Sequence, residues 1–222
     1  MDARVDRIGR LGTPIVTIEA AVGDPDIWRA QALRSDWAPR GDFYPGPRAD
    51  ASHDYLHDLA EPLRVALGRV FGWRSPVDVM GCFYSLATTP AADLIPEQRA
   101  PHVDSFDPDQ VAFVHFLCGA RFGGTAFYRQ RSTGFERIDA GNCNEFERIR
   151  TAESEQLQRE PIDYVAAGSP YFEQLFVCPA AFNRIVLFPS NLLHCADLSG
   201  VTLDPDPAHG RLTVAGFLRP QQ

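Results

Sequence analysis

Residues 111–129, VAFVHFLCGARFGGTAFYR, place two short runs of β-branched and aromatic residues on either side of a Gly-Gly pair. Runs of this length and composition are typical of β-strands, and glycines mark the turn between them. The pattern recurs outward from this segment in both directions. Four further runs of the same kind are VDVMGCFYSLA (77–87), YFEQLFVCP (171–179), NRIVLFP (183–189) and RLTVAGFL (211–218). The sequence therefore predicts at least six strands between residues 77 and 218.

The first 75 residues follow a different period. Residues 24–34 have the composition of a short helix, and apolar residues recur at spacings of three and four between Leu56 and Val70. Both patterns are typical of helices with one apolar face. We therefore expect residues 1–75 to be mainly helical.

Together these patterns predict one α+β, mainly β, domain over residues 1–222. Its core is expected at residues 77–218 as a β-sandwich or barrel, with the N-terminal helices packed on one sheet. A charged segment at about residues 142–160 interrupts the strands and predicts an inserted helix or loop.

Composition narrows the classes of partner and the compartment. The formal net charge of −8 and the pI near 5.2 disfavour nucleic acid, because phosphate binding needs clustered Lys and Arg. No membrane partner is expected, because no apolar run approaches the ~18 residues of a spanning helix. The first residues lack the pattern of a secretory leader, so we expect a cytoplasmic protein. The sequence leaves open whether it is a monomer or a homodimer.

Three side chains have the pattern of a metal site. His102 and Asp104 lie two residues apart, so on an extended segment both point to the same side. His194 follows the predicted strand at residues 183–189. Two imidazoles and one carboxylate form the facial triad that holds Fe(II) and leaves one face of the ion open. The sequence therefore predicts a catalytic metal site formed by His102, Asp104 and His194.

A second pattern predicts a carboxylate-binding site. Arg211 and Thr213 lie on one face of the last strand by its two-residue period, so a guanidinium and a hydroxyl could bind one carboxylate together. Such a pair suits the distal carboxylate of 2-oxoglutarate. The sequence leaves open whether Arg129 and Arg131, which follow the Gly-Gly turn, bind an anionic substrate or face solvent.

Two further residues near these motifs are assigned to the scaffold. His115 lies within the apolar run at residues 111–118 and is expected to be a core histidine with satisfied hydrogen bonds. Cys195 adjoins His194, but strand alternation is expected to direct its thiol away from the metal.

Four motifs carry a resemblance to a known family. PHVD (101–104), GGTAFY (123–128), NRIVLFPSNLLH (183–194) and GRLT (210–213) resemble the 2-oxoglutarate- and Fe(II)-dependent oxygenase superfamily, on its prolyl-hydroxylase-like side. More narrowly, they are similar to a bacterial subfamily of unassigned function. The resemblance implies a double-stranded β-helix, or jelly roll, with Fe(II) near one open end and with 2-oxoglutarate and O2 as cosubstrates.

The resemblance also bears on two details of the site. Tyr84, upstream of PHVD, resembles the tyrosine that many relatives direct toward the cosubstrate carboxylate, although core packing is the favoured role. The loop at residues 197–210 makes the interval from His194 to Arg211 longer than is usual in the family.

The resulting hypothesis is a dioxygenase that hydroxylates a C–H bond of an amino-acid side chain or small molecule, with release of succinate and CO2. Two alternatives stay open. One is a cupin-like metal dioxygenase or hydrolase that uses the same ligands without 2-oxoglutarate and does not depend on Arg211. The other is a catalytically silent jelly-roll binding domain. The substrate, whether protein, peptide or small molecule, is not identified by the sequence.

Overall fold

Two antiparallel sheets form the centre of the protein in the computed structural model, which describes residues 2–41, 43–157 and 163–221. The large sheet has the strand order β1-β2-β9-β6-β11-β5-β4-β3, and the small sheet has the order β10-β7-β8. The strands are β1 (Asp2–Ile8), β2 (Thr13–Glu19), β3 (Ala38–Pro39), β4 (Pro47–Asp50), β5 (Val77–Ala87), β6 (Val111–Phe116), β7 (Gly124–Gln130), β8 (Phe172–Pro179), β9 (Arg184–Pro189), β10 (His194–Asp197) and β11 (Arg211–Pro220).

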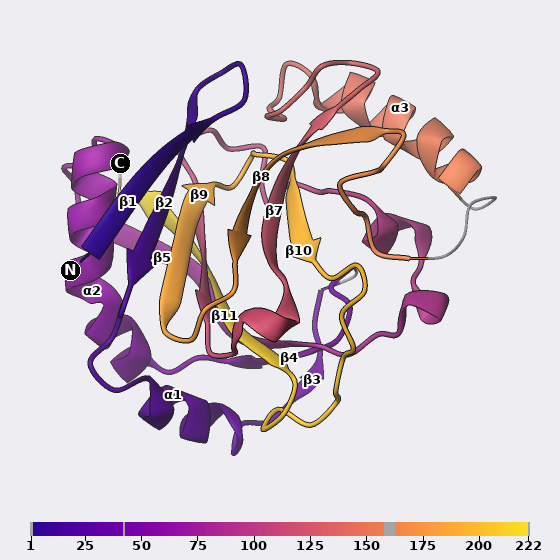
Figure 1. Cartoon of the computed structure of the whole chain (residues 1–222). Coiled ribbons are helices and arrows are strands. Elements are labelled where there is room, and N and C mark those ends of the chain that lie inside the picture. The colour runs from indigo at the N-terminus through magenta and orange to yellow at the C-terminus, as the bar shows by residue number, and fades with distance from the viewer. Residues whose placement is uncertain (1, 42, 158–162, 222) are drawn as a thin grey trace.

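The helices lie outside the two sheets. They are α1 (Pro25–Ala32), α2 (His53–Val70) and α3 (Cys143–Leu157), with short 3-10 helices η1 (Ala91–Asp93), η2 (Pro96–Arg99) and η3 (Ala120–Phe122). Figure 1 shows α1 and α2 on one side of the molecule and α3 on the other. Among the described helices, none is long and apolar enough to cross a membrane.

The six strands predicted from the sequence are all present, as β5, β6, β7, β8, β9 and β11. The small sheet gains a further antiparallel bridge between His102 and His194. From β5 onward, with this bridge counted, the chain passes back and forth between the large and small sheets in the order of a jelly roll, except that the successive strands β7 and β8 both lie in the small sheet. The predicted double-stranded β-helix is confirmed.

The large sheet has helices on its outer face. Tyr55 and Leu59 of α2 are fully buried against Tyr84 of β5 and Val214 of β11. This packing of a helix on a sheet follows from the alternation of side chains, because every second residue of β5 and β11 is apolar and faces the helices. The N-terminal helices thus pack on one sheet, as expected.

The inner face of the large sheet meets the small sheet. Phe116 of β6 and Phe188 of β9 are buried with Phe127 of β7 in one apolar cluster between the two sheets. The remaining residues of β5 and β11 face this side, so Arg211 and Thr213 point into the space between the sheets.

The N-terminal third differs from its prediction. Besides α1 and α2 it contains strands β1 to β4, so it is not mainly helical. Strand β1 was missed because it is an exposed edge strand with the charged sequence DARVDRI, which lacks an apolar period. Strand β4, with the sequence PRAD, was missed because proline disfavours a strand prediction. The insertion predicted at about residues 142–160 is the helix α3. Residues 158–160 of that predicted segment lie outside the described part of the chain.

Candidate metal centre

Backbone pairing brings the two predicted imidazole ligands together. His102 and His194 form an antiparallel bridge in which each backbone N–H donates to the carbonyl of the other, with both N···O distances 2.9 Å. Side chains of such a pair lie on the same face of the sheet. The two imidazole rings accordingly have their centroids 4.6 Å apart. The bridge therefore fixes the relative position of the two histidines.

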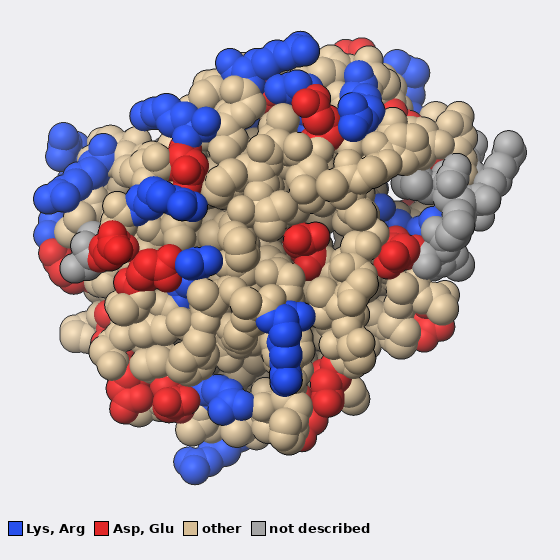
Figure 2. Space-filling model, viewed as in Figure 1, with Lys and Arg blue, Asp and Glu red and all other residues tan. Residues whose placement is uncertain are grey.

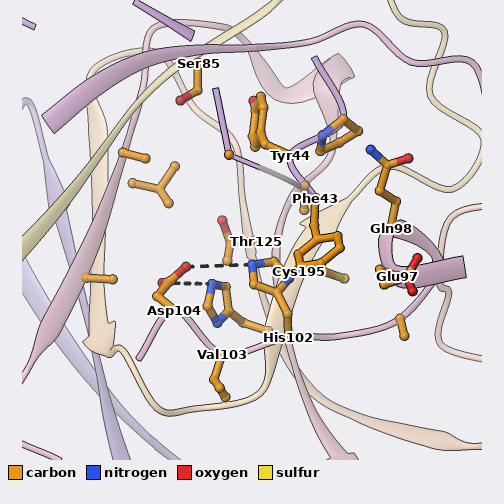
Figure 3. Close-up of a pocket in the computed structure, with 18 of the residues that line it drawn as sticks. Phe43, Tyr44, Ser85, Glu97, Gln98, His102, Val103, Asp104, Thr125 and Cys195 are labelled. Atoms are coloured by element: carbon orange, nitrogen blue, oxygen red, sulfur yellow. Dashed lines mark ion pairs between the residues drawn. The ribbon is translucent and has the colours of Figure 1, made fainter. Parts of the chain in front are cut away.

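Asp104 completes the group from the loop after this bridge. Its backbone N–H donates to the Ser190 carbonyl at 2.8 Å. One carboxylate oxygen lies 3.3 Å from His194 Nε2, and the other lies 3.8 Å from His102 Nε2. Figure 3 shows these two ion pairs converging on Asp104. The three donor atoms all lie within 4.8 Å of one another, so the structure brings the three predicted ligands into one cluster.

Hydrogen bonding orients His194, and the pKa values of the two imidazoles shift in opposite directions. His194 Nδ1 lies 2.8 Å from the Leu192 carbonyl, which can only accept, so Nδ1 carries a proton and Nε2 is the nitrogen that faces Asp104. Desolvation by the surrounding protein lowers the pKa of His102 to about 4, although part of its side chain is exposed, and His194 adds to this effect. Burial alone would also lower the pKa of His194, but the Asp104 carboxylate outweighs it and raises that pKa. His102 is therefore neutral near pH 7.

The donor set fits a divalent first-row metal. Ligands about 2.0–2.2 Å from an ion and at right angles are about 3 Å apart. The separation of 3.3 Å between Asp104 and His194 is close to this value, and that of 3.8 Å between Asp104 and His102 is longer. The side chain of Asp104 is 16% exposed, whereas that of His102 is 55% exposed. The cluster is therefore open on the side of His102, as a catalytic site needs to be.

A cavity of about 520 Å³ extends from this cluster between the two sheets. Arg211 and Thr213 line it, as do the three candidate ligands. Arg211 is buried, and its Nε and Nη2 donate to the carbonyls of Phe122 and Gly124 at 3.2 and 2.8 Å. These two bonds fix the plane of the guanidinium. The predicted pair of guanidinium and hydroxyl thus shares one cavity with the metal cluster.

Tyr84 does not belong to this cavity. It is fully buried on the outer face of the large sheet, where its hydroxyl donates to Gln31 Oε1 at 2.7 Å. The candidate role of Tyr84 in binding the cosubstrate is therefore wrong, and core packing is its role. The period of β5 placed Tyr84 on one face of the strand, but the sequence did not show which face lies inside.

Tyr44 and Tyr164 line the cavity, and the sequence analysis missed both. The Tyr164 hydroxyl donates to the Thr89 carbonyl at 2.8 Å, whereas Tyr44 has no such partner in the described part of the chain. Its phenol oxygen is buried and makes no hydrogen bond of good geometry with any described residue, although the hydroxyls of Ser85 and Thr213 lie near it. Burial raises the pKa of this phenol, while Arg211 opposes the shift. Figure 3 shows Tyr44 and Ser85 on the same side of the cavity. Tyr44 lies in a Pro-Gly-rich loop that has no period to indicate its direction.

Arg129 and Arg131 lie away from the cavity. Arg129 forms ion pairs with Glu136 at 2.7 Å and Glu173 at 2.8 Å. Arg131 is exposed and donates to the Ser169 carbonyl at 3.3 Å. Neither residue faces the metal cluster, so a substrate-binding role for them has no support.

Both scaffold assignments agree with the structure. His115 is a core histidine as predicted, with Nδ1 2.9 Å from the Tyr55 hydroxyl and Nε2 3.1 Å from Asn183 Oδ1. Cys195 pairs with Ala126 of β7, whereas His194 pairs with Phe127, so the two side chains lie on opposite faces of the small sheet. Cys195 is buried there with Ala126 and Tyr128, and it also borders the cavity.

The surface charge agrees with the composition. On the face shown in Figure 2, basic and acidic side chains are interspersed rather than gathered into one basic patch. That face therefore offers no continuous track for a phosphate backbone.

Comparisons with known proteins place the chain in a family and a fold. The model of a family of unknown function, DUF6445, matches residues 1–218, so the chain belongs to that family. No curated protein matches it.

Solved structures show the same fold at low sequence identity. The chain is similar to HygX from Streptomyces hygroscopicus with nickel, 2-oxoglutarate and hygromycin B bound, at 14% identity and a TM-score of 0.50, covering 94% of this chain and 83% of that one. It is similar to AviO1 from Streptomyces viridochromogenes Tue57, at 14% identity and a TM-score of 0.51, covering 93% of this chain and 90% of that one. It is also similar to the non-heme alpha ketoglutarate dependent epimerase SnoN from nogalamycin biosynthesis, at 15% identity and a TM-score of 0.52, covering 93% of this chain and 78% of that one. The predicted resemblance to this oxygenase superfamily is thus confirmed at the level of fold.

Proposed function

We propose that this member of the DUF6445 family is a 2-oxoglutarate- and Fe(II)-dependent oxygenase that hydroxylates a C–H bond of a small molecule or amino-acid side chain. The observation that carries the proposal is one cavity lined by His102, Asp104 and His194 together with Arg211 and Thr213. The first three offer a metal two nitrogens and a carboxylate oxygen, and the last two offer a carboxylate a cation and a hydroxyl. A metal and a dicarboxylate cosubstrate account for both groups.

The chain's own residues would hold the iron in a fixed orientation. When bound, Fe(II) and 2-oxoglutarate supply the reaction with O2 in which the cosubstrate becomes succinate and CO2 and one oxygen atom enters a substrate C–H bond. The backbone bridge between His102 and His194 positions both imidazoles. The Leu192 carbonyl sets the tautomer of His194, which keeps Nε2 available as a ligand. Asp104 contributes the single negative charge of the ligand set.

The other end of the cavity would bind the distal carboxylate of 2-oxoglutarate. Two backbone carbonyls already hold the Arg211 guanidinium, so little side-chain entropy is lost when an anion binds. Thr213 donates to the Ser85 carbonyl at the marginal distance of 3.3 Å, so its hydroxyl can turn toward a better acceptor. The buried Tyr44 hydroxyl, which has no good partner, is a third donor at this end.

Two proteins of similar fold support the choice of cosubstrate. HygX binds nickel and 2-oxoglutarate, and SnoN is alpha ketoglutarate dependent. In this chain the same chemistry is supported by its own donors, since the triad and Arg211 lie at one cavity.

Arg211 provides the test of this function. In anaerobic titrations of 2-oxoglutarate into the Fe(II)-loaded protein, followed by the metal-to-ligand absorption band, Arg211→Ala should weaken binding roughly ten- to a hundredfold, because a charge-assisted contact is lost. Arg211→Lys should fall between wild type and alanine, because lysine keeps the charge but not the planar fork. Iron affinity should not change. Arg64→Ala, at an exposed arginine of α2, is the control and should bind as wild type does.

Three results would contradict the proposal in different ways. Equal 2-oxoglutarate affinities in wild type and both Arg211 variants would remove Arg211 from the cosubstrate site. Binding of iron but not of 2-oxoglutarate by wild type would favour a metal dioxygenase or hydrolase without this cosubstrate, and binding of neither would favour a silent jelly-roll domain.

A further inference from the structure

A second arginine faces the cavity and has no part in the function proposed above. Arg48 lies on β4, where it pairs with Ser85 of β5, and Ser85 pairs in turn with Thr213 of β11. Residues paired in this way point to the same face of a sheet, and all three line the cavity. Neighbouring strands are about 4.8 Å apart, so Arg48 stands about 10 Å from the Thr213 position. Its guanidinium lies over the Tyr44 ring, and in the described part of the chain it forms no contact with Arg211.

The Arg48 guanidinium has no anionic partner in the described part of the chain. It stacks on the Tyr44 ring, with its central carbon 4.1 Å from the ring centroid. Its Nε is buried and has no hydrogen-bond partner there. Burial lowers the pKa of Arg48, while Tyr44 and Asp104 oppose this shift without forming an ion pair with it. A half-buried cation without a partner is costly, and a bound anion would remove that cost.

Asp104 does not take the place of that anion. Its two carboxylate oxygens already face His194 and His102. A metal bound to the cluster would offset the negative charge of the Asp104 carboxylate. The Arg48 cation then stays available beside the open side of the metal centre.

The cavity that Arg48 lines is bordered by exposed apolar side chains. Phe43, Met80 and Phe106 are large apolar residues with 56%, 59% and 42% of their surface exposed. All three line the same cavity as Arg48. Exposed apolar side chains that converge on one concave site are typical of a ligand-binding mouth. The volume of about 520 Å³ is that of a small-molecule site.

We propose that Arg48 binds the acid group of the primary substrate, and that this substrate is a small organic acid whose apolar body lies against Phe43, Met80 and Phe106. The inference rests on the proposed function, because it names the substrate class of the same site. The guanidinium would donate two parallel hydrogen bonds to the acid group and so fix which C–H bond lies beside the metal centre.

The test compares acids with neutral molecules of the same shape. The probes are aryl and alkyl carboxylic acids of about four to ten carbons, among them 4-phenylbutyrate, each paired with its primary amide. Binding is measured by calorimetry on Ni(II)-loaded protein saturated with 2-oxoglutarate, so that the Arg211 end is already occupied and no turnover occurs. We expect the best acid to bind roughly ten- to a hundredfold more tightly than its amide, because the amide lacks the charge-assisted contact.

Variants then assign that preference to one residue. Arg48→Gln should lower the affinity for the acid to that for its amide. The affinities for the amide and for 2-oxoglutarate should not change. Arg48→Lys should restore part of the preference. Arg150→Gln is the matched control, since Arg150 also lines the cavity but is paired with Glu147 at 2.7 Å. It should keep the preference of wild type.

Three outcomes would overturn the inference. In the first, wild type binds no acid more tightly than its amide. In the second, the preference for the acid survives in Arg48→Gln. In the third, Arg48→Gln loses affinity for 2-oxoglutarate, which would make Arg48 a cosubstrate residue. Failure of wild type to bind Ni(II) or 2-oxoglutarate contradicts the proposed function alone. The acid and amide comparison between wild type and Arg48→Gln is then made on the metal-free protein, where the same preference supports Arg48.

Discussion

At the scale of single residues, Tyr44 and Tyr84 show how side-chain direction decides a role. Tyr44 has a buried hydroxyl without a good partner at the Arg211 end of the cavity. Tyr84 has a buried hydroxyl that is satisfied by Gln31 on the opposite face of the large sheet. A polar atom that the fold leaves unsatisfied beside a cavity is a candidate to bind a ligand. A satisfied one in the core contributes to stability.

These two tyrosines give a prediction with an internal control. Tyr44→Phe should weaken 2-oxoglutarate binding roughly tenfold, because one hydrogen bond to a charged group is lost. The unfolding free energy should change little, since the deleted hydroxyl has no good protein partner. Tyr84→Phe should show the reverse, with lower stability and unchanged 2-oxoglutarate affinity. Anaerobic titration and urea unfolding of both variants measure the two quantities, and a cosubstrate effect confined to Tyr84→Phe would refute the assignment.

His115 is a second residue whose environment has a measurable consequence. Its two ring nitrogens are engaged by Tyr55 and Asn183 in the core between the large sheet and α2. Burial lowers the pKa of His115 to about 4, while Asn183 and the more distant Asp58 oppose the shift. The ordinary value in an unfolded chain is about 6.5. Between these two pH values the unfolded chain binds a proton that the folded protein excludes.

The stability of the protein should therefore fall as the pH drops from about 6.5 toward 4. By linkage, this one group removes about 2 kcal/mol of unfolding free energy between pH 7.5 and pH 5. His115→Gln keeps hydrogen-bonding atoms but has no titrating group. Urea unfolding of both proteins at the two pH values should show a pH effect about 2 kcal/mol smaller in His115→Gln. The same loss in both would mean that His115 does not titrate in this range.

At the scale of the elements, the turn between η3 and β7 sets the spacing of the small sheet. Gly123 has φ of +77°, and an added Cβ would lie 1.7 Å from the Asp197 carbonyl oxygen of β10. Asp197 pairs with Gly124 in the same sheet. β10, which begins with the candidate ligand His194, can therefore approach β7 only because residue 123 has no side chain.

A pair of glycine variants separates this close approach from backbone strain. Gly134 has a similar φ of +75°, but nothing lies within 4 Å of its added Cβ. Gly134→Ala should cost about 1 kcal/mol through backbone strain alone. Gly123→Ala adds a steric overlap with β10 and should cost about 3 kcal/mol or more. The unfolding free energies of both variants in urea provide the measurement, and equal losses would show that the overlap is relieved without cost.

At the scale of the whole molecule, the sequence predicted the jelly-roll core and the cluster at its centre. The strands between residues 77 and 218 were recognisable because they combine β-branched and aromatic residues with clear turns. His102 and Asp104 could be paired because their spacing places both side chains on one side of an extended segment. Only the fold could show that His102 and His194 are opposite each other in a backbone bridge.

The missed features depend on information that local sequence does not contain. Alternation along β5 does not show which face lies inside, so the choice of Tyr84 was wrong. Tyr44 and Arg48 come from a Pro-Gly-rich loop and a short edge strand, and their place beside the site follows from the pairing of β4 with β5. Arg129 was undecided because its partners, Glu136 and Glu173, are brought to it by the fold.

The metal cluster joins two parts of the molecule, the loop that carries Asp104 and the strand β10. A ligand that binds only the folded state stabilises it, by about 2.7 kcal/mol when its free concentration is a hundredfold above the dissociation constant. For a chain of this size, that corresponds to a rise in melting temperature of about 5–10 °C. We expect Fe(II) under anaerobic conditions, and Ni(II) in air, to produce this rise in wild type.

Asp104→Ala tests whether this stabilisation comes from the candidate ligands. It should abolish both the metal-dependent rise in melting temperature and iron-dependent succinate formation, while the metal-free melting temperature stays close to that of wild type. His194 keeps its bond to the Leu192 carbonyl, and the bridge to His102 uses only backbone atoms, so the local fold does not need the carboxylate. Asp107→Ala, in the same loop, should retain the full metal effect, because Asp107 pairs with Arg219 instead. A metal-dependent rise that persists in Asp104→Ala would show that the ion binds elsewhere.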